Sequence, residues 1–159
     1  MTTYYRPSAP GGRVLAGHCV TAESIIEFGV LRLQASVIKG QKYWLVVLRL
    51  PSRKPAHVPW QTVRFATADF HIRDLSTGAL SSGLPVAVLR NDEYDSVVDP
   101  YDLARPGDWL YSIDVNVSAL PPERFELWLP PMVLDGHEIR YSPIVFERKI
   151  WEGISPFNC

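Results

Sequence analysis

The sequence predicts an all-β fold, an antiparallel β-sandwich of the immunoglobulin-like or jelly-roll type with about nine short strands and little helix. Three observations support this prediction. The 159-residue chain contains 14 prolines, which remove backbone donors and so divide it into short elements. Several segments alternate apolar and polar residues, whereas no stretch shows an uninterrupted helical spacing of apolar residues. The length suits one ordinary domain.

The first part of the chain, residues 1–23, is rich in proline and glycine and has no regular period. We expect it to form an irregular arm packed on a single sandwich domain of residues 24–159. An extended segment is predicted at 25–28, and a β-hairpin at 30–50 around the tight connection Lys39-Gly40-Gln41. The second strand of this hairpin is apolar on both faces, which predicts a central strand covered on both sides.

The rest of the chain predicts further strands, separated by turn signals at Thr77-Gly78 and Asp135-Gly136. These strands are expected at 62–66, 69–74, 85–90, 109–117, 125–129, 137–141 and 143–150. Two long connections interrupt them, a proline-rich one at 51–60 and an acidic one at 91–108. Trp128 falls on the polar side of its strand, so we expect it to be covered by the N-terminal arm or to belong to an interface.

The near-zero net charge of −1 hides an uneven distribution. Residues 1–91 hold 11 Lys and Arg against 4 Asp and Glu, whereas residues 92–159 hold 5 against 13. The two parts either neutralise each other on the surface or form patches of opposite sign, one of which meets a charged partner. A balanced total argues against a protein that coats nucleic acid.

The acidic connection is the strongest candidate for recognition. We expect a partner-binding site formed by Asp92, Glu93, Tyr94, Asp95, Asp99, Tyr101 and Asp102. Carboxylates steer a basic partner, and tyrosines add contact area at low entropic cost. A solvated acidic loop is the alternative. Calcium binding is a third reading, although the spacing lacks the pattern and closing glutamate of an EF-hand.

The proline-rich connection offers a secondary binding loop. Its candidate residues are Arg53, Lys54, His57 and Trp60. A loop stiffened by prolines loses less entropy on binding, so it could hold an anion, a glycan or a groove of another protein. The alternative is a solvated crossover in which Trp60 covers the edge of the core.

No motif for catalysis, cofactor binding or metal binding is present. The sequence lacks a G-x-S-x-G elbow, a phosphate-binding glycine loop and zinc-ligand spacings. We therefore expect no enzymatic activity, no cofactor and no metal site. The longest apolar run, residues 43–48, is far shorter than a membrane-spanning helix, so no membrane insertion is expected.

The two cysteines, Cys19 and Cys159, lie near opposite ends of the chain. A disulfide between them would favour a periplasmic or secreted protein, and two unrelated thiols would suit a cytoplasmic one. The N-terminus has no signal-peptide layout, so we expect either a cytoplasmic chain or a mature exported one.

Together these features predict a non-enzymatic protein-binding domain, for example an exported bacterial inhibitor or immunity-type protein that binds a basic partner through its acidic loop. Two alternatives belong to other classes. One is a carbohydrate- or calcium-binding sandwich module, and the other is a structural subunit of a larger assembly that uses exposed strand edges. Fold alone does not decide among them.

Overall fold

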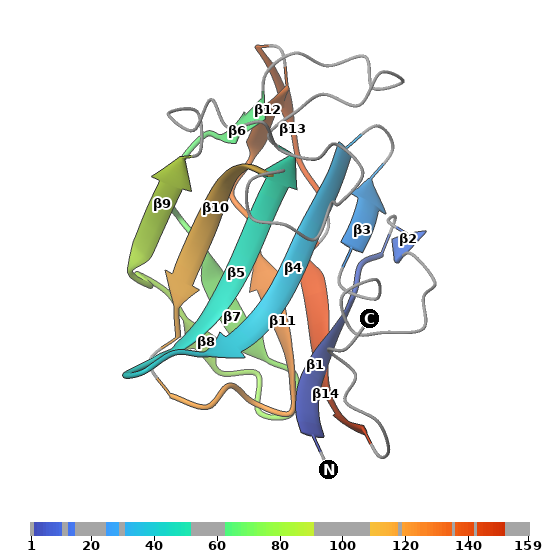
Figure 1. Ribbon diagram of the computed structural model, residues 1–159, viewed down its shortest axis with the longest axis vertical. Coiled ribbons are helices and arrows are strands. Elements are labelled where there is room, and N and C mark those ends of the chain that lie inside the picture. The colour runs from blue at the N-terminus through green and yellow to red at the C-terminus, as the bar shows by residue number, and fades with distance from the viewer. Residues whose placement is uncertain are drawn as a thin grey trace.

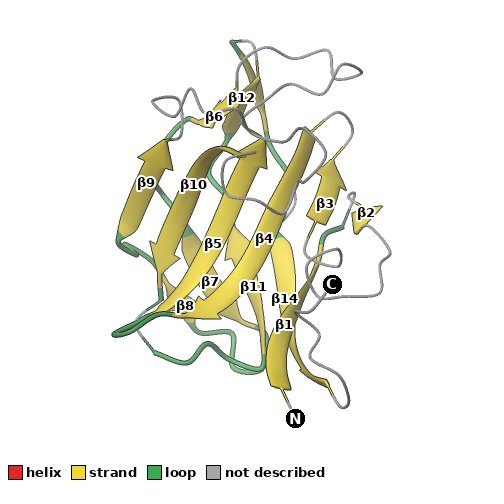
Figure 2. Cartoon of the chain, viewed as in Figure 1, coloured by secondary structure: helices red, strands yellow, loops and turns green. Residues whose placement is uncertain are grey.

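The computed structural model describes residues 2–10, 13–14, 25–28, 31–51, 63–90, 109–117, 119–134, 136–141 and 143–151. Within these ranges every regular element is a β-strand and every strand pairing is antiparallel, as Figures 1 and 2 show. The predicted all-β, antiparallel class is confirmed. The described residues form 14 strands in three sheets, more than the nine expected. None of them forms a helix long and apolar enough to cross a membrane.

The first large sheet has six strands and contains the predicted hairpin. Its order is β2 (Arg13–Val14), β3 (Ile25–Phe28), β4 (Leu31–Lys39), β5 (Trp44–Pro51), β10 (Trp109–Asn116) and β9 (Val86–Arg90). In the β4–β5 turn the Gly40 amide donates to the Tyr43 carbonyl over 2.8 Å. A Cβ on Gly40 would lie 3.0 Å from that oxygen, a tight contact, so a larger residue would press on the turn. As predicted, β5 lies inside its sheet, and Val46, Val47 and Leu48 are all buried.

The second large sheet has five strands. Its order is β1 (Thr2–Ser8), β14 (Ile144–Trp151), β11 (Arg124–Trp128), β7 (His71–Asp74) and β8 (Leu80–Ser81). The prediction of an irregular arm is wrong for residues 2–8, because they form β1 and pair along their whole length with β14. Pro7 is tolerated there because β1 is an edge strand, where a missing amide donor breaks no ladder on the open side.

The third sheet has three short strands in the order β13 (His137–Ile139), β12 (Met132–Leu134) and β6 (Val63–Phe65). Gly136, from the predicted turn signal, connects β12 and β13 with a φ of 82°. This left-handed backbone conformation favours glycine. Three further strands were not predicted from the sequence: β12, which begins directly after Pro130-Pro131, and the two-residue strands β2 and β8.

The buried apolar side chains form one core cluster that draws on both large sheets, and Figure 1 shows one of these sheets in front of the other. Fully buried apolar side chains come from both, including Leu33 and Val46 of the six-stranded sheet and Leu127 of the five-stranded sheet. Phe125 lies among aromatic neighbours, with ring centroids 5.1 Å from Phe146 and 5.7 Å from Tyr5. Burial of these side chains is the main stabilising contribution to the fold.

Candidate functional site

The residues predicted for partner binding lie outside the described part of the chain. This holds for Asp92, Glu93, Tyr94, Asp95, Asp99, Tyr101 and Asp102, for Arg53, Lys54, His57 and Trp60, and for Cys19 and Cys159. The strands that flank the two connections are described, and they determine where each connection begins. The binding roles predicted for residues of the two connections therefore stay predictions, as does the pairing of the two cysteines.

The two long connections begin at the same end of the six-stranded sheet. Strands β5, β10 and β9 are consecutive neighbours in this sheet. Trp109, the first residue of β10, pairs with Pro51, the last residue of β5. Tyr111 pairs with Arg90, the last residue of β9. The proline-rich connection after Pro51 and the acidic connection from Arg90 to Trp109 thus start from adjacent strand ends, seen at the upper end of the sheet in Figure 1.

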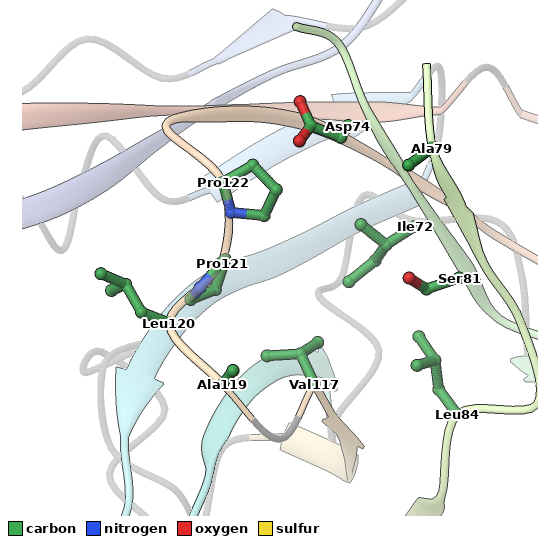
Figure 3. A pocket seen from close by; sticks show the side chains of 10 residues that line it. All are labelled: Ile72, Asp74, Ala79, Ser81, Leu84, Val117, Ala119, Leu120, Pro121 and Pro122. Carbon is green, nitrogen blue, oxygen red and sulfur yellow. The ribbon is translucent and has the colours of Figure 1, made fainter. Parts of the chain in front are cut away.

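A pocket of about 410 Å³ lies at the opposite end of β10. One side is formed by the β7–β8 hairpin and the connection to β9, and the other by the segment between β10 and β11 (Figure 3). Most of the lining residues are aliphatic or proline, and the full set is Ile72, Asp74, Ala79, Ser81, Leu84, Val117, Ala119, Leu120, Pro121 and Pro122. This volume falls within the range of typical small-molecule sites, about 300–1,000 Å³.

The hairpin side of the pocket is held by a turn that Asp74 organises. Its Oδ1 accepts a hydrogen bond from the Ser76 amide at 2.8 Å, and its backbone carbonyl accepts one from the Gly78 amide, also at 2.8 Å. Gly78 has a φ of 76°, which favours glycine at this position. The predicted Thr77-Gly78 turn is confirmed, and it places the Asp74 carboxylate beside the pocket (Figure 3).

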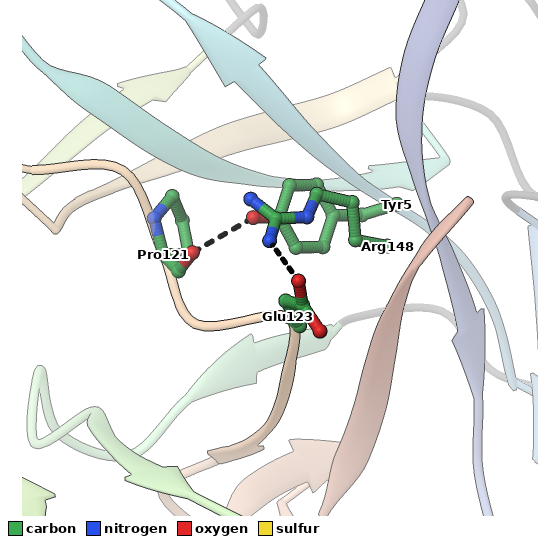
Figure 4. Close-up of polar contacts among 4 residues, drawn as sticks. All are labelled: Tyr5, Pro121, Glu123 and Arg148. Carbon is green, nitrogen blue, oxygen red and sulfur yellow. Dashed lines mark hydrogen bonds and ion pairs between the residues drawn. The ribbon is translucent and has the colours of Figure 1, made fainter. Parts of the chain in front are cut away.

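The opposite side of the pocket is anchored by contacts to β1 and β14 (Figure 4). The buried Tyr5 hydroxyl donates to the Pro121 carbonyl over 2.8 Å. Arg148 holds Glu123 twice, since its amide donates to the Glu123 carbonyl over 2.7 Å and its guanidinium pairs with Glu123 Oε1 at 2.6 Å. Burial raises the pKa of Tyr5 above its usual value of 10.0, against the opposing effect of Arg148, so the hydroxyl remains a donor at neutral pH.

Trp128, which the sequence places on the polar side of its strand, stacks on His71 of the neighbouring strand. The ring centroids are 5.8 Å apart and the ring planes meet at 15°. Strand β1 does not cover Trp128, because β14 lies between β1 and β11 in the same sheet. The indole is half-buried on the outer face of the five-stranded sheet.

No sequence pattern indicates the pocket, because its two sides come from distant parts of the chain. Asp74 and Pro121 line the same space only because β7 and β11 are neighbours in the folded sheet. The turn signal at Thr77-Gly78 and the Pro121-Pro122 pair can both be recognised in the sequence. Nothing in the sequence indicates that these two segments lie close together in the fold. Within the described ranges, no three His, Cys, Asp or Glu side chains gather in a group that could hold a metal ion.

Comparison of the chain with protein-family models, with curated proteins and with solved structures gave no match. The class of protein that the fold defines is an all-β protein with antiparallel sheets.

Proposed function

We propose that the two large sheets form a single β-sandwich domain, immunoglobulin-like or jelly-roll in type, that binds another protein and catalyses no reaction. The partner is a protein with a basic surface. The acidic connection, with Asp92, Asp95, Asp99 and Asp102, steers the encounter, and Tyr94 and Tyr101 provide contact area. An inhibitor or immunity-type role suits this mode of action.

The register of β5, β10 and β9 is the observation that carries this proposal. Pairing of Trp109 with Pro51 and of Tyr111 with Arg90 brings both ends of the acidic connection and the start of the proline-rich connection to one end of one sheet. Binding residues commonly lie on connections that a rigid sheet holds in place. The proline-rich connection, which carries Arg53, Lys54, His57 and Trp60, starts next to the acidic connection, and we propose that these residues contribute to the same binding surface. Because the basic proline-rich connection starts beside the acidic one, their opposite charges also partly neutralise each other.

We also propose that the protein is periplasmic or secreted. A disulfide between Cys19 and Cys159 in a periplasmic or secreted protein would tie the two ends of the chain together, which is typical of small exported domains. Intact-mass measurement before and after alkylation under non-reducing conditions tests it. A mass increase from two alkylated thiols in protein isolated from its native compartment would overturn the disulfide.

The test of the binding proposal uses the full chain as bait for affinity capture, followed by kinetic measurements on any captured basic protein. The test variant neutralises two carboxylates of the acidic connection, Asp99→Asn with Asp102→Asn. The matched control neutralises two exposed carboxylates of the described surface, Asp69→Asn with Glu138→Gln, which changes the net charge by the same amount. We expect the test variant to lower the association rate and the salt dependence of that rate, and the control to leave both near the wild-type values.

The outcomes separate specific steering from general charge effects. Equal slowing by the test and control pairs would mean that only net charge matters and would overturn the assignment to the acidic connection. Unchanged rates in the four-fold variant, with Asp92→Asn and Asp95→Asn added, would also overturn it.

A further inference from the structure

We propose that the pocket between the β7–β8 hairpin and the β10–β11 connection binds an organic ammonium ion that carries an apolar carbon chain. This site is separate from the proposed protein-binding surface, because it lies at the other end of β10. The proposal rests on the apolar lining, the single carboxylate and the anchored walls of the pocket.

The lining favours an apolar carbon chain. Eight of the ten lining residues are aliphatic or proline, and Asp74 and Ser81 are the polar exceptions. Ile72 is 6% exposed and belongs to the core cluster, so the inner end of the pocket reaches the edge of the core. Leu120 is 52% exposed and lies on the solvent side. A ligand chain in the pocket covers Ile72 and other aliphatic lining residues and so removes apolar surface from water on both partners, which favours binding.

The charge of the pocket favours a cation. Asp74 uses Oδ1 in the hydrogen bonds to the turn amides of Ser76 and Thr77. In the described ranges no Lys or Arg forms an ion pair with Asp74. The cations next to it in the sheet, Arg73 and Arg124, are exposed and alternate with inward residues, so they project from the opposite face. Since no cation of the described residues pairs with the half-buried Asp74 carboxylate, the ammonium group of a ligand can form that ion pair.

The pocket is formed before a ligand arrives. Pro121 and Pro122 restrict the backbone of one wall, and the Tyr5 hydroxyl and Arg148 fix the positions of Pro121 and Glu123. The Asp74 turn fixes the other wall. Binding to walls that are already ordered loses little conformational entropy, so a small amine can bind without rearrangement of the sheets.

Three ligands of similar length test the charge requirement. The probes are n-hexylamine, n-hexanol and hexanoate, added to the full chain at neutral pH and followed by amide chemical shifts in two-dimensional NMR. We expect n-hexylamine to shift resonances of the lining residues, n-hexanol to bind about tenfold more weakly, and hexanoate to bind least. A preference for hexanol or hexanoate over hexylamine overturns the proposal, and so does the absence of shifts with hexylamine at the pocket.

A lysine side chain from another protein presents the same chemistry as a free amine. The probe for that source is Nα-acetyl-lysine N-methylamide, in which two peptide bonds flank the side chain. Binding comparable to that of hexylamine assigns the site to lysine side chains, and binding of hexylamine alone assigns it to small amines.

Two variants locate the binding. Asp74→Asn removes the charge but keeps an oxygen that can accept the turn hydrogen bonds, and it should reduce the affinity for hexylamine about tenfold, to the level of hexanol. The matched control is Asp69→Asn, an exposed carboxylate outside the pocket, which should change nothing. Leu120→Ala removes exposed apolar surface and should weaken hexylamine and hexanol alike. Equal hexylamine affinity in wild type, Asp74→Asn and Leu120→Ala overturns the proposal. If Asp74→Asn fails to fold, the ligand series and Leu120→Ala still decide it.

Discussion

Strands β5 and β11 occupy similar inner positions in the two large sheets, yet they bury their residues in different patterns. In β11 burial alternates, since Phe125 and Leu127 are fully buried whereas Glu126 and Trp128 are partly exposed. In β5 three consecutive residues, 46–48, are buried at 0%, 4% and 1% exposure. The five-stranded sheet therefore keeps an open outer face at β11, whereas the six-stranded sheet has its outer face covered at the centre of β5.

Cross-strand neighbours on the two outer faces differ accordingly. Across the five-stranded sheet, Glu147 lies opposite Arg6 on one side and Arg124 on the other, all three exposed. Across the six-stranded sheet, Val47 lies between Ser36 and Asp114, which are half-buried. Val47 is outside the core cluster, as expected for a side chain on the outer face, and it is nevertheless buried. The row of exposed charges indicates that the outer face of the five-stranded sheet is solvated. The burial of Val47 indicates that the outer face of the six-stranded sheet is covered at this position.

The alternation in β11 predicts opposite effects for two adjacent truncations. Phe125→Ala should lower the free energy of unfolding by about 3–5 kcal/mol, because it leaves a cavity between Phe146 and Tyr5. Glu126→Ala, the matched control on the outer face, should change it by about 0.5 kcal/mol or less. Urea denaturation followed by tryptophan fluorescence measures both. Similar losses for the two variants would contradict the assignment of an open outer face to β11.

The covered face of β5 predicts an intermediate effect. Val47→Thr keeps the shape of the side chain but buries a hydroxyl, and it should cost about 1–3 kcal/mol. Val145→Thr, the matched control on the half-buried outer face of β14, should cost less than about 1 kcal/mol, because its hydroxyl can bind water. Chemical denaturation of both variants checks the difference. Equal costs at the two positions would mean that the outer faces do not differ.

The sequence predicted the elements in which local pattern and burial agree. The apolar run of 43–48 and the alternation over 109–117 predicted β5 and β10, and the glycines at 40, 78 and 136 marked real turns. It failed where pairing depends on distant residues. Strand β1 has no clear period, and it exists because β14, almost the whole chain away, provides a partner edge. The pocket was missed for the same reason, since its walls meet only through the order of strands in the sheet.

The charged row on the open face predicts the smallest effect. Glu147 pairs with Lys149 over 3.0 Å, and this hydrogen bond and charge, with smaller contributions from Arg124 and Arg6, lower the pKa of Glu147 below its usual value of 4.5. Since the folded pKa is depressed, the stabilisation is present above pH 4.5 and is lost as the pH falls through the folded pKa.

Lys149→Met should raise the pKa of Glu147 toward 4.5, Arg6→Met should raise it less, and Lys42→Met in the distant β4–β5 turn should leave it unchanged. An NMR titration of the Glu147 side chain measures these shifts, and they should shrink at 1 M salt because the face is solvated. A pKa of Glu147 that responds to neither Lys149→Met nor Arg6→Met would show that these charges do not interact, and the contrast between the two outer faces would then rest on the burial patterns of β5 and β11.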